Sequence, residues 1–176
     1  PMVLADMQLA ANTPADIIIF NIDAKSESDG KSNKDAIVNV FLKVFNNSLG
    51  FCGAIPYLAD LERKLTEDGK YEQFKETYQR VTGHDWYEER HEFLSRQDGV
   101  VDTLIEMGYM SEKAAWNWCD AAIGDYQISI EDFAKRVKSY IDRKGNNHHV
   151  VFLVDEIGQY IGDDRSLMLN LQTIVE

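Results

Sequence analysis

Two adjacent carboxylates, Asp155 and Glu156, directly follow the apolar run Val150-Val151-Phe152-Leu153-Val154. Such a run predicts a buried strand, and nucleotides bind at the carboxyl ends of the strands of a parallel sheet. Because neighbouring residues of a strand face opposite ways, the two carboxylates can take different roles. In one interpretation Asp155 holds Mg²⁺ through water and Glu156 orients and deprotonates an attacking water, as in the Walker B motif of P-loop ATPases. In the other, the two acids only cap the following helix.

A second segment, Gly30-Lys31-Ser32, is similar to the end of the phosphate-binding loop G-x-x-x-x-G-K-[ST] and lies between a predicted strand and a predicted helix. The similarity ends there, because Lys25 stands where the first glycine is needed. Glu27 and Asp29 also place negative charge where an anion should bind. We therefore expect a solvated loop at this point and no Walker A motif in the chain.

Both ends of the sequence suggest a fragment. The chain opens on Pro1-Met2, and the apolar run over 167–176 stops without a glycine, an asparagine or a basic last turn. In P-loop folds the Walker A strand and helix come before Walker B. We therefore expect the missing half of an ATP site upstream of Pro1.

The elements that must position the two carboxylates are short strands predicted over 16–23 and 149–154. Both are β-branched and aromatic runs bounded by turn signals, which is typical of strands covered on both faces. The stretch between them has apolar residues at helical spacing, with helix starts indicated at Pro56, Asp85 and Ser129. Two parallel strands need a crossover connection. The sequence thus predicts part of an α/β sheet with a helical subdomain inserted into its connection.

This pattern divides the chain into three parts. Residues 1–33 form the first α/β element of a partial ATPase core, and residues 34–147 form the helical insertion. Residues 148–176 form the strand that carries the Walker B motif and the helix after it.

Composition and charge exclude several classes of protein. The chain has 176 residues, 44% of them hydrophobic, and a net charge of −12, which is typical of a globular protein but not of a disordered one. Its negative field repels phosphate backbones and anionic lipid, so we expect no nucleic-acid or membrane binding from this segment. No apolar run approaches the ~20 residues of a membrane helix, and no secretion signal is present. We expect a cytoplasmic protein in which Cys52 and Cys119 are buried thiols, a single bridge being the alternative.

Two other groups of residues could bind metal ions. His84, Glu88 and His91 have the spacing of one helix face, although a solvated face is the alternative. Asp23 could join the Asp155-Glu156 pair at neighbouring strand ends and hold two divalent ions, as in a metal-dependent hydrolase. No D-x-D or E-x-K pattern supports this second site.

Five groups of segments resemble the large P-loop ATPase family of BREX phage-resistance systems (BrxC, also called PglY). The resemblance runs from about Asp16 to Glu176, nearly the whole chain. The segments are Asn21-Ile22-Asp23-Ala24-Lys25-Ser26, Val44-Phe45-Asn46 with Gly50-Phe51-Cys52-Gly53, Ala59-Asp60-Leu61-Glu62-Arg63, Phe152-Leu153-Val154-Asp155-Glu156-Ile157-Gly158-Gln159-Tyr160-Ile161-Gly162-Asp163-Asp164 and Leu167-Met168-Leu169-Asn170-Leu171-Gln172-Thr173.

The resemblance implies an AAA+-like ATPase in a bacterial defence complex that distinguishes methylated self DNA from phage DNA. The implied fold class is α/β, a partial P-loop NTPase sheet with a large, mostly helical insertion. Asp155 and Glu156 match the Walker B pair, and the family's Walker A lies N-terminal to the segment seen here. The full-length protein would use ATP and Mg²⁺ and contact other BREX defence proteins or neighbouring ATPase protomers.

A different class of function is also open. The missing Walker A motif and the dominance of helix favour a non-catalytic helical module for protein–protein interaction, with the α/β part as a scaffold. A G-x-x-x-x-G-K-[ST] loop just upstream of Pro1 would decide for the ATPase.

Overall fold

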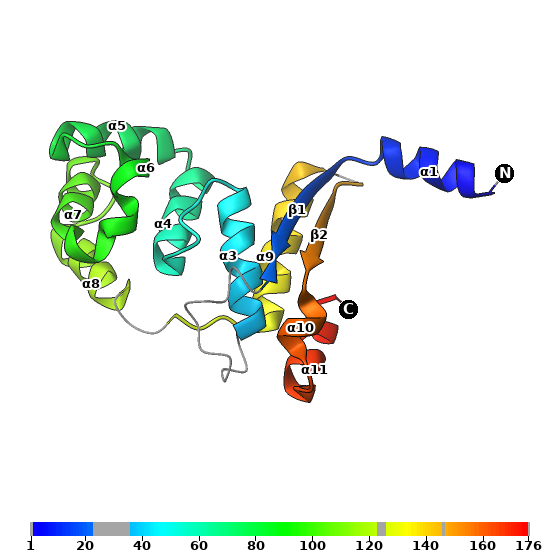
Figure 1. The fold of residues 1–176 in the computed structure, drawn as a ribbon. Coiled ribbons are helices and arrows are strands. Elements are labelled where there is room, and N and C mark those ends of the chain that lie inside the picture. Colours follow the sequence, from blue (N-terminus) through cyan, green and yellow to red (C-terminus); the bar gives the residue numbers. More distant parts are fainter. Residues whose placement is uncertain (1, 23–35, 123–125, 146, 176) are drawn as a thin grey trace. The chain divides into compact units, whose positions relative to one another are not determined.

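The computed structural model describes residues 2–22, 36–122, 126–145 and 147–175 (Figure 1). The chain forms two compact units. We call Pro1–Phe45 together with Gln127–Glu176 the sheet unit, and Asn46–Tyr126 the helical unit. The chain is mostly helical with a small parallel sheet, as expected for the α/β class. The predicted division at residues 33 and 147 stays a prediction.

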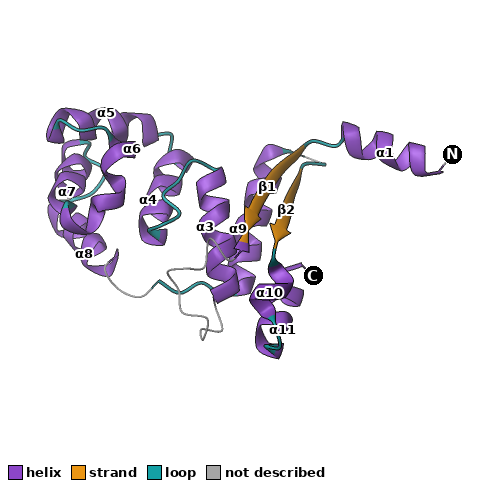
Figure 2. Cartoon of the chain, in the orientation of Figure 1, coloured by secondary structure: helices purple, strands orange, loops and turns teal. Residues whose placement is uncertain are grey.

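Two parallel strands form the sheet, β1 (Ala15–Asn21) and β2 (His149–Asp155) (Figure 2). Their register pairs Ala15 with His149 at one end and Asn21 with Asp155 at the other. The two strands predicted from the sequence are therefore confirmed to be neighbours in the sheet, and both end at the same edge.

Helices of the sheet unit pack against one face of this sheet. They are α3 (Ala36–Ser48), whose last residues belong to the helical unit, and α9 (Ile130–Lys144). Phe41 of α3 lies 5.4 Å from Phe20 of β1 and 5.1 Å from Phe152 of β2, measured between ring centroids. Phe133 of α9 contacts Phe152 at 6.4 Å. This aromatic cluster is the core of the sheet unit.

The opposite face of the sheet carries apolar side chains that are open to solvent. The exposed fractions are 62% for Ile17, 74% for Ile19, 39% for Val151 and 48% for Leu153. The prediction that both strands are covered on both faces is therefore wrong. Its physical reason is that α3 and α9 pack on the same face.

The described part of the sheet unit has three further helices. Before the sheet comes α1 (Met2–Asn12), which the sequence analysis did not predict. After it come the short α10 (Ile157–Ile161) and α11 (Arg165–Val175). Ser129 begins α9 as predicted, because its hydroxyl accepts a hydrogen bond from the backbone N–H of Asp132 at 3.0 Å.

The helical unit closes on a core of its own. Its elements are α4 (Pro56–Glu67), α5 (Tyr71–Thr82), α6 (Trp86–Glu89), the 3₁₀ helix η1 (Arg90–Ser95), α7 (Gln97–Glu106) and α8 (Glu112–Ala122). Leu58, Phe74, Trp86 and Leu104 are all at most 1% exposed. Asp85 caps α6 as predicted, accepting from the N–H groups of the two following turn residues, Tyr87 and Glu88.

Candidate functional site

The candidate site lies at the carboxyl edge of the two-stranded sheet. The parallel register places Asn21, the last residue of β1, beside Asp155, the last residue of β2. Glu156 follows at once and precedes α10. Three polar side chains from two distant segments thus meet at the edge where parallel sheets bind ligands.

Glu156 is held in an uncommon backbone conformation. Its φ of 60° and ψ of 16° lie in the left-handed region, which costs a residue with a side chain roughly 1–2 kcal/mol. The Asn21 side-chain amide donates a hydrogen bond to Glu156 Oε2. The turn and this hydrogen bond together fix where the carboxylate lies, an arrangement that often accompanies functional sites.

Asp155 is also exposed, and it supports the same turn. Its Oδ1 accepts a hydrogen bond from the backbone N–H of Glu156 at 2.9 Å. Carboxylate oxygens at such an edge are the donors that Mg²⁺ prefers, so this pair fits a magnesium site. Asp155 and Glu156 are consecutive in the chain, and their roles as a pair stay a prediction.

Asn21 was missed as a site residue by the sequence analysis. In the sequence it comes near the end of a predicted strand and opens one of the segments that carry the resemblance, but its partner becomes evident only from the register. The candidate phosphate loop Gly30-Lys31-Ser32 and the candidate metal ligand Asp23 lie outside the described residues.

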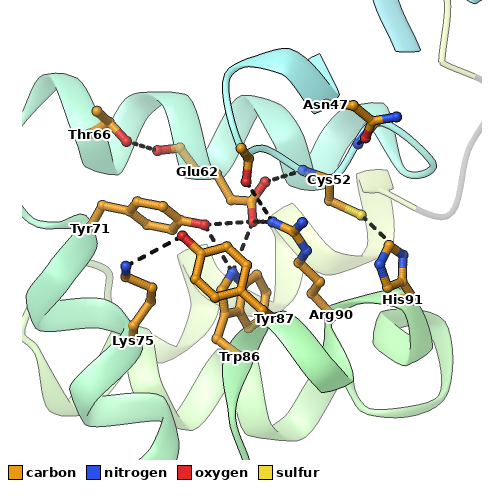
Figure 3. Close-up of polar contacts among 12 residues, drawn as sticks. Asn47, Cys52, Glu62, Thr66, Tyr71, Lys75, Trp86, Tyr87, Arg90 and His91 are labelled. Atoms are coloured by element: carbon orange, nitrogen blue, oxygen red, sulfur yellow. Dashed lines mark hydrogen bonds and ion pairs between the residues drawn. The ribbon is translucent and has the colours of Figure 1, made fainter. Parts of the chain in front are cut away.

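A second polar cluster lies inside the helical unit, around Glu62 of α4 (Figure 3). Glu62 is 0% exposed, and its Oε1 accepts from the Tyr71 hydroxyl at 2.8 Å and from Trp86 Nε1 at 2.9 Å. Arg90 Nη1 makes an ion pair with the same oxygen at 3.0 Å. Oε2 accepts from the backbone N–H of Cys52. A buried carboxylate with this many donors is a structural anchor rather than a reactive group.

Three of the segments that carry the family resemblance meet in this part of the helical unit. Asn46 accepts from Arg63, Gly50 O accepts from Arg90 Nη1 at 2.8 Å, and the Cys52 N–H donates to Glu62. The distinctive residues of these segments therefore hold the helical unit together.

The two thiols of the helical unit are buried, and its two histidines have different neighbours. Cys52 and Cys119 are both buried and free, and burial raises both pKa values, that of Cys119 to about 11. His91 Nδ1 lies 3.9 Å from Cys52 Sγ, whereas His84 Nδ1 lies 3.2 Å from Glu89 Oε1. The two histidines of the candidate metal site thus have separate partners.

Glu89 borders an open cavity of about 470 Å³ in the helical unit. Its carboxylate accepts from the Tyr78 hydroxyl at 3.1 Å and makes an ion pair with Arg96 at 3.0 Å. Among the described residues no group of three or more histidine, cysteine, aspartate or glutamate side chains is arranged to hold a metal ion. The protein itself already supplies the partners of the carboxylate in this cavity.

No known protein family and no solved structure matches this chain. Within the described ranges, no helix is both long enough and apolar enough to cross a membrane. A proposal about function must therefore be argued from the side chains at the sheet edge.

Proposed function

We propose that this chain is part of an AAA+-like ATPase of a bacterial BREX phage-defence system and that Asp155 and Glu156 are its Walker B pair. One observation carries the proposal. Two carboxylates lie at the carboxyl edge of parallel strands, and Glu156 is held there by Asn21 in a left-handed turn. A residue that only capped a helix would not require this conformation.

Each side chain has a separate task in this function. Asp155 would hold Mg²⁺, which would supply positive charge to neutralise the phosphates of ATP. Glu156 orients the attacking water and accepts its proton. Asn21 is a positioning residue, because its amide sets the direction of the Glu156 carboxylate.

The sequence has no Walker A motif, and this loop supplies most contacts to phosphate in P-loop proteins. The 176-residue chain alone should therefore bind ATP poorly. Isothermal titration calorimetry with Mg-ATP checks this expectation. Micromolar affinity would contradict the assignment, since the phosphates would then be bound by residues outside the proposal.

The roles of the carboxylates are tested in a longer natural protein that includes a Walker A motif. Glu156→Gln should keep ATP binding and lower the hydrolysis rate by about 100-fold or more, because the amide cannot accept a proton. Glu131→Gln, an exposed acid on α9, is the matched control and should keep the full rate. Undiminished hydrolysis by Glu156→Gln would remove Glu156 from its role.

The helical unit favours a second candidate function, a non-catalytic module for protein–protein interaction. Its core is formed by its own helices, and the buried Glu62 carboxylate is held by Tyr71, Trp86 and Arg90 of the same unit. If a longer natural protein that includes this chain does not bind ATP, that result favours the interaction module over the ATPase. The partners would be BREX defence proteins or neighbouring protomers in either case.

A further inference from the structure

One face of the sheet, which we call the bare face, carries the exposed apolar side chains of Ile17, Ile19, Val151 and Leu153. Ile17 pairs with Val151 and Ile19 pairs with Leu153 in the parallel register, so these four side chains form one patch. Parallel sheets are almost always covered by helices on both faces. Here α3 and α9 pack on one face, and among the residues that the structure describes no helix covers the second face.

The helix α1 also carries apolar side chains that are exposed to solvent. Val3, Leu4 and Met7 are 71%, 62% and 64% exposed, and their spacing places them with Ala10 and Ala11 on one side of the helix. Every side chain of α1 that the structure describes is exposed. Figure 1 shows α1 running outward from the start of β1, off the sheet.

The connection to β1 keeps α1 from folding back on its own sheet. Pro14 O already accepts from the His149 N–H at 2.9 Å, so the strand pairing starts there. Thr13 is tied to the helix, since its hydroxyl donates to Leu9 O at 2.8 Å. Only Thr13 and Pro14 join α1 to β1, which is the short end of the usual 2–6 residues, and a residue before proline favours an extended backbone. A reversal on its own sheet would break these contacts.

We propose that two copies of this chain associate by exchanging α1, so that Val3, Leu4 and Met7 of each copy cover the bare sheet face of the other. The exchange is reciprocal and closes on a twofold axis. The proposal concerns the 176-residue chain and goes beyond the ATPase function. Its oligomeric state is measured without nucleotide, so a failure of this proposal is distinguishable from a failure of the ATPase assignment.

The size of the two surfaces suits such a dimer. Seven large apolar side chains take part from each copy, and at roughly 100 Å² each they expose about 700 Å². A standard interface buries about 800 Å² from each partner. These seven side chains are apolar, but α1 also carries the exposed Asp6, and each copy has a net charge of −12. Apolar burial therefore drives the association, and added salt should strengthen it by screening the repulsion between copies.

Size-exclusion chromatography with light scattering tests the proposal on the 176-residue chain. At about 100 μM we expect twice the 20.1 kDa of one chain. Ile19→Glu and Met7→Lys should each weaken dimerisation by at least about 100-fold, since two symmetric contacts are lost. Leu94→Glu is the control, because Leu94 is 60% exposed in the helical unit and takes no part. Circular dichroism checks that each variant is folded.

A mixing experiment tests the exchange itself. Neither Met7→Lys nor Ile19→Glu should dimerise alone, but an equimolar mixture of the two should. In the mixed dimer the unchanged α1 of the Ile19→Glu chain covers the unchanged sheet face of the Met7→Lys chain. A wild-type chain that is monomeric at about 100 μM would overturn the proposal. So would open-ended oligomers, a variant dimer as stable as the wild type, or a mixture that stays monomeric.

Discussion

Glu62 of the helical unit and Glu156 of the sheet unit are both held by hydrogen bonds, but their surroundings are opposite. Glu62 is 0% exposed and accepts from Tyr71, Trp86 and the backbone of Cys52. Glu156 is exposed, has one side-chain donor in Asn21, and sits in a left-handed turn. The same side-chain type thus anchors one unit and is presented to solvent by the other.

The comparison extends to the apolar cores. The helical unit surrounds its core with its own helices, whereas the sheet unit leaves Ile17, Ile19 and Leu153 open. We therefore expect substitutions in the two units to change different properties. Changes in the helical unit should cost folding free energy, and changes at the sheet edge should cost function.

The largest expected loss of unfolding free energy is that caused by Arg90→Met in the helical unit. This change removes the guanidinium that pairs with Glu62 at 3.0 Å and leaves a buried carboxylate without its counter-charge. Breaking a buried pair in this way costs about 3–5 kcal/mol. The free energy of unfolding of the helical unit should fall by that amount.

Tryptophan fluorescence during urea unfolding measures this effect. All three tryptophans, Trp86, Trp116 and Trp118, lie in the helical unit, so their emission reports on it alone. Arg80→Met is the control, because its pair with Glu106 is exposed and worth about 0–1 kcal/mol. Equal losses in the two variants would contradict the anchoring role of Glu62.

A smaller loss of unfolding free energy is expected for Tyr71→Phe. The tyrosine hydroxyl donates to Glu62 Oε1 at 2.8 Å in the buried cluster, and a hydrogen bond to a charged group is worth about 1.5–3 kcal/mol. Tyr109→Phe removes a similar bond to the exposed Asp68 and should cost under about 1 kcal/mol. The same unfolding experiment compares the two, and equal costs would show that burial adds nothing to the cluster.

The smallest expected effect is a pH dependence of the sheet unit. The Tyr140 hydroxyl donates to Asp16, and His148 Nε2 lies 3.0 Å from the same oxygen, which together lower the pKa of Asp16 below 3.8. Because the folded-state pKa is lower than the unfolded one, this stabilisation is present above the unfolded value and is lost as pH falls through the folded value. Asp16 is 40% exposed, so the contribution should stay under about 1 kcal/mol.

Urea unfolding followed by far-UV circular dichroism between pH 7 and 3 measures this contribution. The difference between wild type and Asp16→Asn should be constant at neutral pH and shrink in the acid range. Asp163→Asn, an exposed acid of the same unit, should show no such convergence. A difference that grows on acidification would reverse the sign derived from the Asp16 pKa.

The two strands could be predicted because they depend on local patterns, and the same patterns placed the two carboxylates at the end of the second strand. An apolar run followed by Asp155 and Glu156 is visible without any tertiary information. Asn21 was missed, since its importance depends on the register that places it beside β2. The bare sheet face was missed for a related reason, because a continuous apolar run does not say how many faces are covered.

The buried cluster could not be predicted from Glu62 itself. In the sequence Glu62 is one charged residue on an amphipathic helix, and such residues are usually exposed. Its burial requires Arg90, 28 residues further on, together with Tyr71 and Trp86. These donors come from three other elements, so the pattern of α4 alone contains no sign of them.

The pairing of β1 with β2 has a consequence for how the protein is made. Asn21 and Glu156 are 135 residues apart, and the whole helical unit lies between the two strands in the chain. During synthesis the helical unit emerges complete before β2 exists, and its contacts are short in sequence. Closing so long a loop is entropically costly and slow compared with helix packing. The helical unit should therefore fold first on the ribosome, while β1 stays unpaired until β2 has been synthesised.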